Sequence, residues 1–175
     1  MGDAAAEEMA RQLADCEDSV HSQRLAEAMG DLGHAGGSHA GVLVEKLAHS
    51  DVAVWRAAGE ALVRLGSVAA EALAERLGQL RPMHAYVRMR LEEVLRWMGS
   101  EGAAVLAEQV ASAQRAQVRM HAARALGRMG AVSLPFLEVL AARLYKETDA
   151  AARRAAAEAL ARLGPSGGAH LTLCL

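Results

Sequence analysis

An apolar residue followed by glycine recurs five times along this 175-residue chain, at nearly even intervals. The glycines are 33, 33, 31 and 34 residues apart, in the pairs Leu32-Gly33, Leu65-Gly66, Met98-Gly99, Met129-Gly130 and Leu163-Gly164. Self-similarity at a fixed period of about 20 to 50 residues indicates a repeat architecture. Because glycine takes the left-handed backbone conformation at little cost, each of these glycines is expected to end a helix. The recurrence therefore predicts five copies of one structural unit.

The residues before each glycine predict a helix with one apolar face. Small or aliphatic side chains stand one, four, five and eight residues before the glycine, which in the second copy are Leu65, Leu62, Ala61 and Ala58. This spacing follows the 3.6-residue period of an α-helix. Three copies place an aspartate, a typical N-cap residue, fifteen residues before the glycine: Asp18, Asp51 and Asp149.

A second, leucine-rich helix is expected after each glycine; the first copy fits if its loop, HAGGSHAG, is three residues longer. One such pair cannot bury its apolar face alone, whereas stacked pairs share a continuous core. We therefore predict an all-α, right-handed α-solenoid of about five helix pairs, forming a single domain over residues 1–175. The expected repeats are 18–49, 51–80, 84–112, 115–146 and 149–175, with residues 4–14 as an N-terminal capping helix.

Two segments, 117–144 and 149–164, resemble HEAT repeats, in the short form that is also found in phycobilisome-lyase-like proteins. The resemblance is carried by an aspartate at the helix start, the pattern V-R-x-x-A-A-x-A-L-G-x-L-G and a leucine-rich second helix. The signatures of ankyrin and tetratricopeptide repeats are absent. The resemblance implies a solenoid whose second helices line a concave, partner-binding surface, but a fold by itself does not define a function.

Composition and motifs exclude several classes of protein. Apolar residues make up 53% of the chain but aromatic residues only 3%, which suits close-packed helices. No apolar window is long enough to span a membrane, and the acidic start does not fit a secretory signal. Because Cys16 and Cys174 are the only cysteines, no disulfide framework is expected, and an intracellular, reducing compartment is predicted.

No catalytic, cofactor-binding or metal site is predicted, and we expect a protein that is not an enzyme. None of the seven histidines precedes a glutamate, which excludes the His-Glu iron ligands of HEAT-like deoxyhypusine hydroxylases. His34 and His39, with no cysteine nearby, supply too few ligands for a metal ion. Phosphate-binding loops and nucleophile elbows are also absent.

Two tryptophans stand where other copies have polar residues. Trp55 lies eleven residues before its glycine, where the HEAT pattern places an arginine, and Trp97 lies two before, where the other four copies are charged. Tryptophan is enriched at binding hot spots, so both are candidates for partner binding; alternatively, each ring is half-buried over the groove between adjacent repeats. The other partner-binding candidates are Arg88, Arg119, Arg76 and Arg143.

The predicted function is a non-catalytic protein–protein interaction scaffold, adaptor or peripheral subunit of a complex. Resemblance leaves a bilin lyase component as the alternative. Nucleic-acid binding is disfavoured because the eight arginines of residues 81–128 are interleaved with four glutamates. The apolar end HLTLCL, up to Leu175, predicts self-association or a partner contact at the C-terminal edge. Partner, pathway, organelle, oligomeric state and fragment status stay open.

Overall fold

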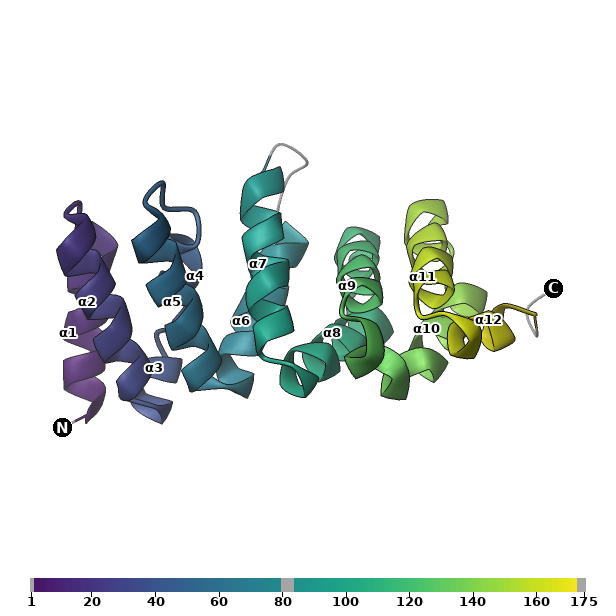
Figure 1. The fold of residues 1–175 in the computed structure, drawn as a ribbon, viewed down its shortest axis with the longest axis horizontal. Helices are drawn as coiled ribbons and strands as arrows, with labels where there is room; N and C mark the ends of the chain where they lie inside the picture. Colours follow the sequence, from purple (N-terminus) through teal and green to yellow (C-terminus); the bar gives the residue numbers. More distant parts are fainter. Residues whose placement is uncertain (1, 80–83, 173–175) are drawn as a thin grey trace. The chain divides into compact units, whose positions relative to one another are not determined.

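The computed structural model describes residues 2–79 and 84–172, and every regular element in these ranges is a helix (Figure 1). The chain divides into two compact units. Unit 1 comprises Met1–Arg76 and Arg81–Met98, and unit 2 comprises Leu77–Leu80 and Gly99–Leu175. The predicted all-α fold of repeated helix pairs is confirmed, whereas the single domain over residues 1–175 stays a prediction.

Unit 1 contains the acidic N-terminal part of the chain. Helix α2 packs on α1 and α5, and α5 also packs on α4 and α7. The first half of the predicted loop HAGGSHAG forms the one-turn helix α3, which packs against α1, α2 and α5. The helices are α1 (Gly2–Asp15), α2 (Ser19–Asp31), α3 (His34–Gly37), α4 (Ala40–Lys46), α5 (Val52–Leu65), α6 (Ser67–Gln79, whose last residues belong to unit 2) and α7 (Ala85–Trp97).

Unit 2 repeats the same arrangement. Helix α9 packs on α8 and α11, while α10 packs on α8, α11 and α12. A 3₁₀ segment, η1, contains Pro135 and precedes α10, because proline lacks the N–H that a regular helix interior needs. The elements are α8 (Ser100–Ser112), α9 (Ala116–Arg128), η1 (Gly130–Phe136), α10 (Leu137–Lys146), α11 (Ala150–Arg162) and α12 (Pro165–Thr172).

The turns and caps behave as the sequence predicts. All five marker glycines have a positive φ, between 56° and 75°. The carboxylates of the three predicted N-caps accept a hydrogen bond from a backbone N–H in the first helical turn, at 2.6 to 2.8 Å: Asp18, Asp51 and Asp149. The N-cap residues of α7 and α9 are His84 and Arg115, and neither makes a side-chain cap hydrogen bond.

Two pairs of first helices approach each other closely through glycine. A Cβ atom on Gly30 of α2 would lie 2.8 Å from the Cα atom of Ala61 in α5, and one on Gly127 of α9 would lie 2.6 Å from the Cα of Ala159 in α11. Real Cβ atoms do not come this near to backbone, so both contacts require glycine. Buried leucines and alanines fill the rest of the core, including Leu62, Leu95, Leu126 and Leu160.

Candidate protein-binding site

Trp55 of α5 and Trp97 of α7 stack on each other in unit 1. Their ring centroids are 6.2 Å apart, and the ring planes differ by 17°. Both residues are half-buried. An aromatic pair in this geometry adds about 0.5–1.5 kcal/mol to the stabilisation from area burial. The rings therefore bridge two helices, which is the packing arrangement that the sequence left open as the alternative to free exposure.

The contact between α5 and α7 is made by side chains rather than by backbone. A Cβ atom on Gly59 of α5 would lie 2.9 Å from Cγ2 of Val94 and 3.0 Å from Cζ3 of Trp97. At Gly30 and Gly127, by contrast, the neighbouring helix comes near with its own Cα atom. A valine and an indole ring thus occupy the space between α5 and α7, and Trp97 packs there against Gly59.

Arg90 of α7 covers the tryptophan stack. Its guanidinium carbon lies 4.8 Å from the centroid of the Trp55 ring and 5.4 Å from that of Tyr86. The same side chain donates hydrogen bonds of 2.8 Å from Nη1 to the backbone carbonyls of Leu47 and His49. Arg90 is therefore held at both sides, by cation–π contacts and by carbonyl acceptors that follow α4.

We call the position eleven residues before each turn glycine, where the HEAT pattern places an arginine, the ladder position. At this position Arg119 and Arg153 donate to the carbonyl six residues earlier, that of Ala113 and Glu147 respectively. With Trp55 at the ladder position, the carbonyl six residues earlier, that of His49, is bonded by Arg90 instead. The predicted candidate Arg88 occupies the ladder position of α7 but makes no hydrogen bond or ion pair with the described residues.

Two large side chains beside Arg90 are exposed to solvent. Tyr86 is 52% exposed and Met89 is 65% exposed, and they stand one turn and one residue before Arg90 on α7. Close to Trp97, a shallow hollow is lined by Arg56, Glu60, Val63 and Arg64. We call the group Trp55, Tyr86, Met89, Arg90 and Trp97 the aromatic face. Tryptophan, tyrosine, methionine and arginine are the residue types enriched at protein interfaces.

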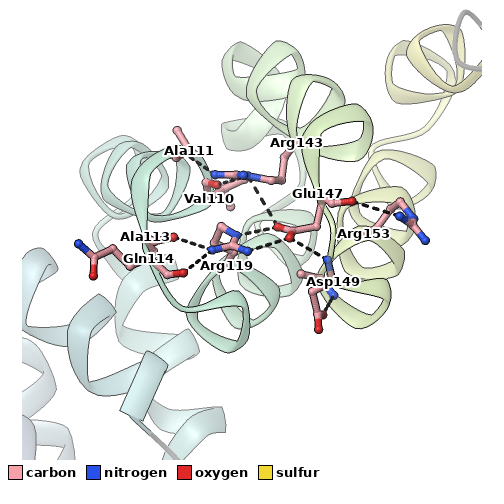
Figure 2. A network of polar contacts seen from close by, with 10 residues as sticks. Val110, Ala111, Ala113, Gln114, Arg119, Arg143, Glu147, Asp149 and Arg153 are labelled. Carbon is pink, nitrogen blue, oxygen red and sulfur yellow. Dashed lines mark hydrogen bonds and ion pairs between the residues drawn. The ribbon is translucent and has the colours of Figure 1, made fainter.

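The candidates Arg119 and Arg143 belong to a buried polar network in unit 2 (Figure 2). Glu147, which follows α10 and is 3% exposed, accepts two hydrogen bonds from Arg119, of 2.6 Å from Nε and 2.7 Å from Nη2. The backbone N–H of Asp149 donates to the same carboxylate at 3.1 Å. Arg143 lies 3.9 Å from it and donates to the carbonyls that end α8, those of Val110 and Ala111.

The hydrogen bonds of this network fix its charges. Donation from Arg119 lowers the pKa of Glu147 to about 2, although burial raises it. The same pair raises the pKa of Arg119. The side chains of Arg119 and Arg143 are only 11% and 19% exposed. Both arginines therefore tie α8, α9 and α10 together and present little surface to a partner.

The last candidate, Arg76 of α6, pairs with Glu45 of α4. Its Nε atom lies 3.1 Å from Oε1 of Glu45, within ion-pair distance but without the angle of a hydrogen bond, and its Nη2 donates to Oε2 at 3.2 Å. The two side chains are 30% and 62% exposed. This pair is a surface contact, separate from the aromatic face.

Sequence reasoning missed two residues of these sites. Glu147 lies two residues before the N-cap Asp149, and the equivalent residue of the second repeat, His49, accepts from the backbone N–H of Asp51 through Nδ1 in the same way, also at 3.1 Å. A search for acceptor side chains two residues before each N-cap would have found Glu147 and His49. Arg90 lies outside the ladder position, and no signal in the sequence marks it.

Three further sequence predictions concern metal binding, membrane spans and the C-terminal edge. Within residues 2–79 and 84–172, no three side chains of His, Cys, Asp or Glu come together in a way that would hold a metal ion. None of the helices described in these ranges is both long and apolar enough to cross a bilayer. The apolar C-terminal edge, with Cys174 and Leu175, lies outside the described residues.

Comparison with known proteins agrees with the repeat architecture. A sequence family described as HEAT repeats matches residues 77–161, just under half of the chain. The matched residues are therefore similar to HEAT repeats, and with the helix pairs of both units the match confirms the all-α solenoid fold. No curated protein matches the sequence.

Several solved structures are similar over most of the chain. An engineered protein is 20% identical, with 95% of this chain and 83% of that chain covered and a TM-score of 0.41. Human deoxyhypusine hydroxylase in complex with glycerol is 20% identical, with 98% and 90% covered and a TM-score of 0.43. A second engineered protein is 21% identical, with 96% and 50% covered and a TM-score of 0.42. At these values the similarities carry no information about function.

Proposed function

We propose that this chain is a non-catalytic protein-binding scaffold and that its partner docks on the aromatic face of unit 1. The observation that carries the proposal is the stacked pair Trp55 and Trp97, covered by Arg90 and flanked by two exposed side chains, Tyr86 and Met89. HEAT repeats, which the sequence match supports, fit a scaffold of this kind.

Binding to the aromatic face would cost little conformational entropy. Arg90 is already fixed by the carbonyls of Leu47 and His49, and each tryptophan is fixed by the other, so little rotamer freedom is lost when a partner docks. Tyr86 and Met89 each expose more than half of their surface to water. Covering apolar surface stabilises a complex by about 25 cal/mol per Å². The rigid stack would act as a platform, and the two exposed side chains as the anchors.

The intrinsic fluorescence of the protein offers a direct test. Trp55 and Trp97 are the only tryptophans in the chain, and both belong to the aromatic face. Partners would be captured from the native source on the immobilised full-length chain, identified, purified and titrated against it. We expect the tryptophan emission to change on binding, and the double variant Tyr86→Ala/Met89→Ala to bind at least about tenfold more weakly, as for the loss of hot-spot residues.

A matched control separates this face from general apolar adhesion. Val20 of α2 is 58% exposed and lies outside the aromatic face, so Val20→Ala removes exposed apolar surface elsewhere in unit 1. The control should bind as the wild type does. A purified partner that binds all three proteins with equal affinity, or that leaves the tryptophan emission unchanged, would refute the proposal.

A further inference from the structure

Four equivalent positions on neighbouring first helices carry opposite net charges in the two units, because two of the four change from an acid to an arginine. These positions lie six and two residues before the turn glycine. In unit 1, helices α2 and α5 have three acids and one base at them: Glu27, Asp31, Glu60 and Arg64. In unit 2, helices α9 and α11 have three bases and one acid: Arg124, Arg128, Glu158 and Arg162. The formal charge thus changes from −2 to +2, while the glycine–alanine contact between the helices is the same.

In unit 1 the protein supplies its own carboxylate to this arrangement. Arg64 crosses from α5 to α2, where its Nε lies 3.4 Å from Oδ1 of Asp31 and its Nη2 donates to the carbonyl of Glu27 at 3.2 Å. The residue equivalent to Asp31 in unit 2 is Arg128, and the residue equivalent to Arg64 is Arg162. At these two positions unit 2 therefore has two arginines where unit 1 has an aspartate and an arginine.

The unit 2 positions surround a hollow of about 170 Å³, lined by Arg124, Arg128, Glu158, Ala159 and Arg162. The one carboxylate present, that of Glu158, lies 3.9 Å from Nε of Arg124, at the limit of an ion pair. Arg162 makes no hydrogen bond or ion pair with the residues that the structure describes. The small residues Gly127 and Ala159 keep the two helices close, and three arginines from these helices line the same hollow.

We infer that this hollow, which we call the arginine notch, binds an aspartate or glutamate side chain from an acidic segment of a partner protein. The carboxylate would take the place that Asp31 fills in unit 1, between the arginines of two adjacent helices. Arginine donates paired hydrogen bonds that match the two oxygens of a carboxylate. The notch is a second binding site, made of unit 2 residues alone, and it does not depend on the function proposed for the aromatic face.

A short groove favours a carboxylate side chain over a nucleic-acid backbone. Duplex DNA is held by many cations spread along a surface, whereas here three arginines converge on one hollow that also contains Glu158. A glutamate beside the site repels a dianionic phosphate more strongly than a single carboxylate. The observations therefore favour a protein segment rich in aspartate or glutamate.

The test is a titration of the full-length chain with a fluorescein-labelled peptide rich in aspartate and glutamate, followed by anisotropy. A second peptide, with every acid replaced by its amide, measures the requirement for charge. The informative variant is Arg128→Asp, which rebuilds the unit 1 arrangement by giving Arg162 an internal carboxylate. We expect both changes, the amide peptide and this variant, to weaken binding at least about tenfold, as for loss of a charged hydrogen bond.

Arg115→Asp is the matched control, because it makes the same charge change at the other end of α9. It places aspartate where α2, α5 and α11 have their N-cap, so the fold should be kept, and circular dichroism would verify this for both variants. Unchanged peptide affinity in this control supports the notch. Equal weakening by Arg115→Asp and Arg128→Asp, equal affinity for the acidic and amide peptides, or displacement of the peptide by inorganic phosphate or duplex DNA at lower concentration would overturn it.

Discussion

The two units satisfy the same backbone carbonyl with different side chains. In unit 2 the ladder residue Arg119 bonds the carbonyl of Ala113 and continues to the buried carboxylate of Glu147. In unit 1 the ladder residue is Trp55, and the carbonyl of His49 receives its donor from Arg90 on the next first helix. Each of these part-buried carbonyls has a side-chain donor, and the donor comes from a different helix in the two units.

This difference leaves one region buried and the other partly exposed. In unit 2, Arg119 and Glu147 pair with each other, and their side chains have almost no exposed surface. The aromatic version leaves two half-buried rings and exposed neighbours at the surface of α5 and α7. The first arrangement therefore contributes stability, and the second exposes the surface that we propose for partner binding. Predictions that test this division follow in order of decreasing effect.

The largest effect is expected for Arg119→Ala. The change leaves the carboxylate of Glu147 buried with its two main donors gone, and breaking a buried pair from one side costs about 3–5 kcal/mol. The free energy of unfolding, from urea denaturation followed by circular dichroism, measures this loss. Arg88→Ala, at the same ladder position of α7, should change stability by less than about 0.5 kcal/mol. Similar losses in both variants would remove the distinction between the two ladder positions.

Acid should weaken the same network. The pKa of Glu147 is about 2 in the folded protein against an ordinary 4.5, so its contribution is fully present above pH 4.5 and is lost as the pH falls towards about 2. The difference corresponds to a stabilisation on the order of 3 kcal/mol. Unfolding free energies measured across this pH window should fall more steeply for the wild type than for Glu147→Gln. Parallel curves would show that the carboxylate does not carry this stability.

A smaller loss is expected for Trp55→Ala. The ring is half-buried, so its removal should cost about 2 kcal/mol, roughly half the cost of deleting a fully buried aromatic residue. Trp55→Arg restores a ladder arginine six residues after the carbonyl of His49, and we expect it to recover part of this stability. Thermal unfolding of the two variants compares them directly. An arginine variant less stable than the alanine variant would mean that Arg90 leaves no room for a donor from α5.

The smallest effect is expected for Arg76→Ala. Its partner Glu45 is 62% exposed, and a solvent-exposed ion pair contributes about 0–1 kcal/mol. Any loss of stability should shrink further as salt is added, because salt screens exposed charges. Urea denaturation at low and high ionic strength would measure it. A loss as large as that of Arg119→Ala would contradict the ranking of exposed and buried pairs.

The fold was accessible from sequence because its signals are local. The positive φ of Gly66 and the N-cap at Asp51 each depend on a few neighbouring residues, and the apolar stripe between them follows the helical period. The parts that escaped prediction depend on distances between helices. The indole of Trp97 fills the space opposite Gly59 because α5 and α7 are separated by side chains, and no residue pattern within one repeat reports that separation.

The candidate site was therefore predictable only in part. The sequence marked Trp55 and Trp97 as unusual but could not show that they contact each other, since they are 42 positions apart in the chain (97 minus 55). It placed weight on Arg88, whereas the structure uses Arg90. Side chains two positions apart on a helix point about 200° away from each other. The guanidinium group of Arg90 therefore lies on another side of α7 than that of Arg88.

The carbonyl of His49 shows how a chain of tandem units can acquire specificity. Its hydrogen bond comes from Arg90 of the following repeat, so the residue at position 55 does not have to supply a donor and can vary. An engineer could therefore randomise position 55 while holding Arg90 constant, and would change the surface chemistry of one repeat while keeping this backbone hydrogen bond.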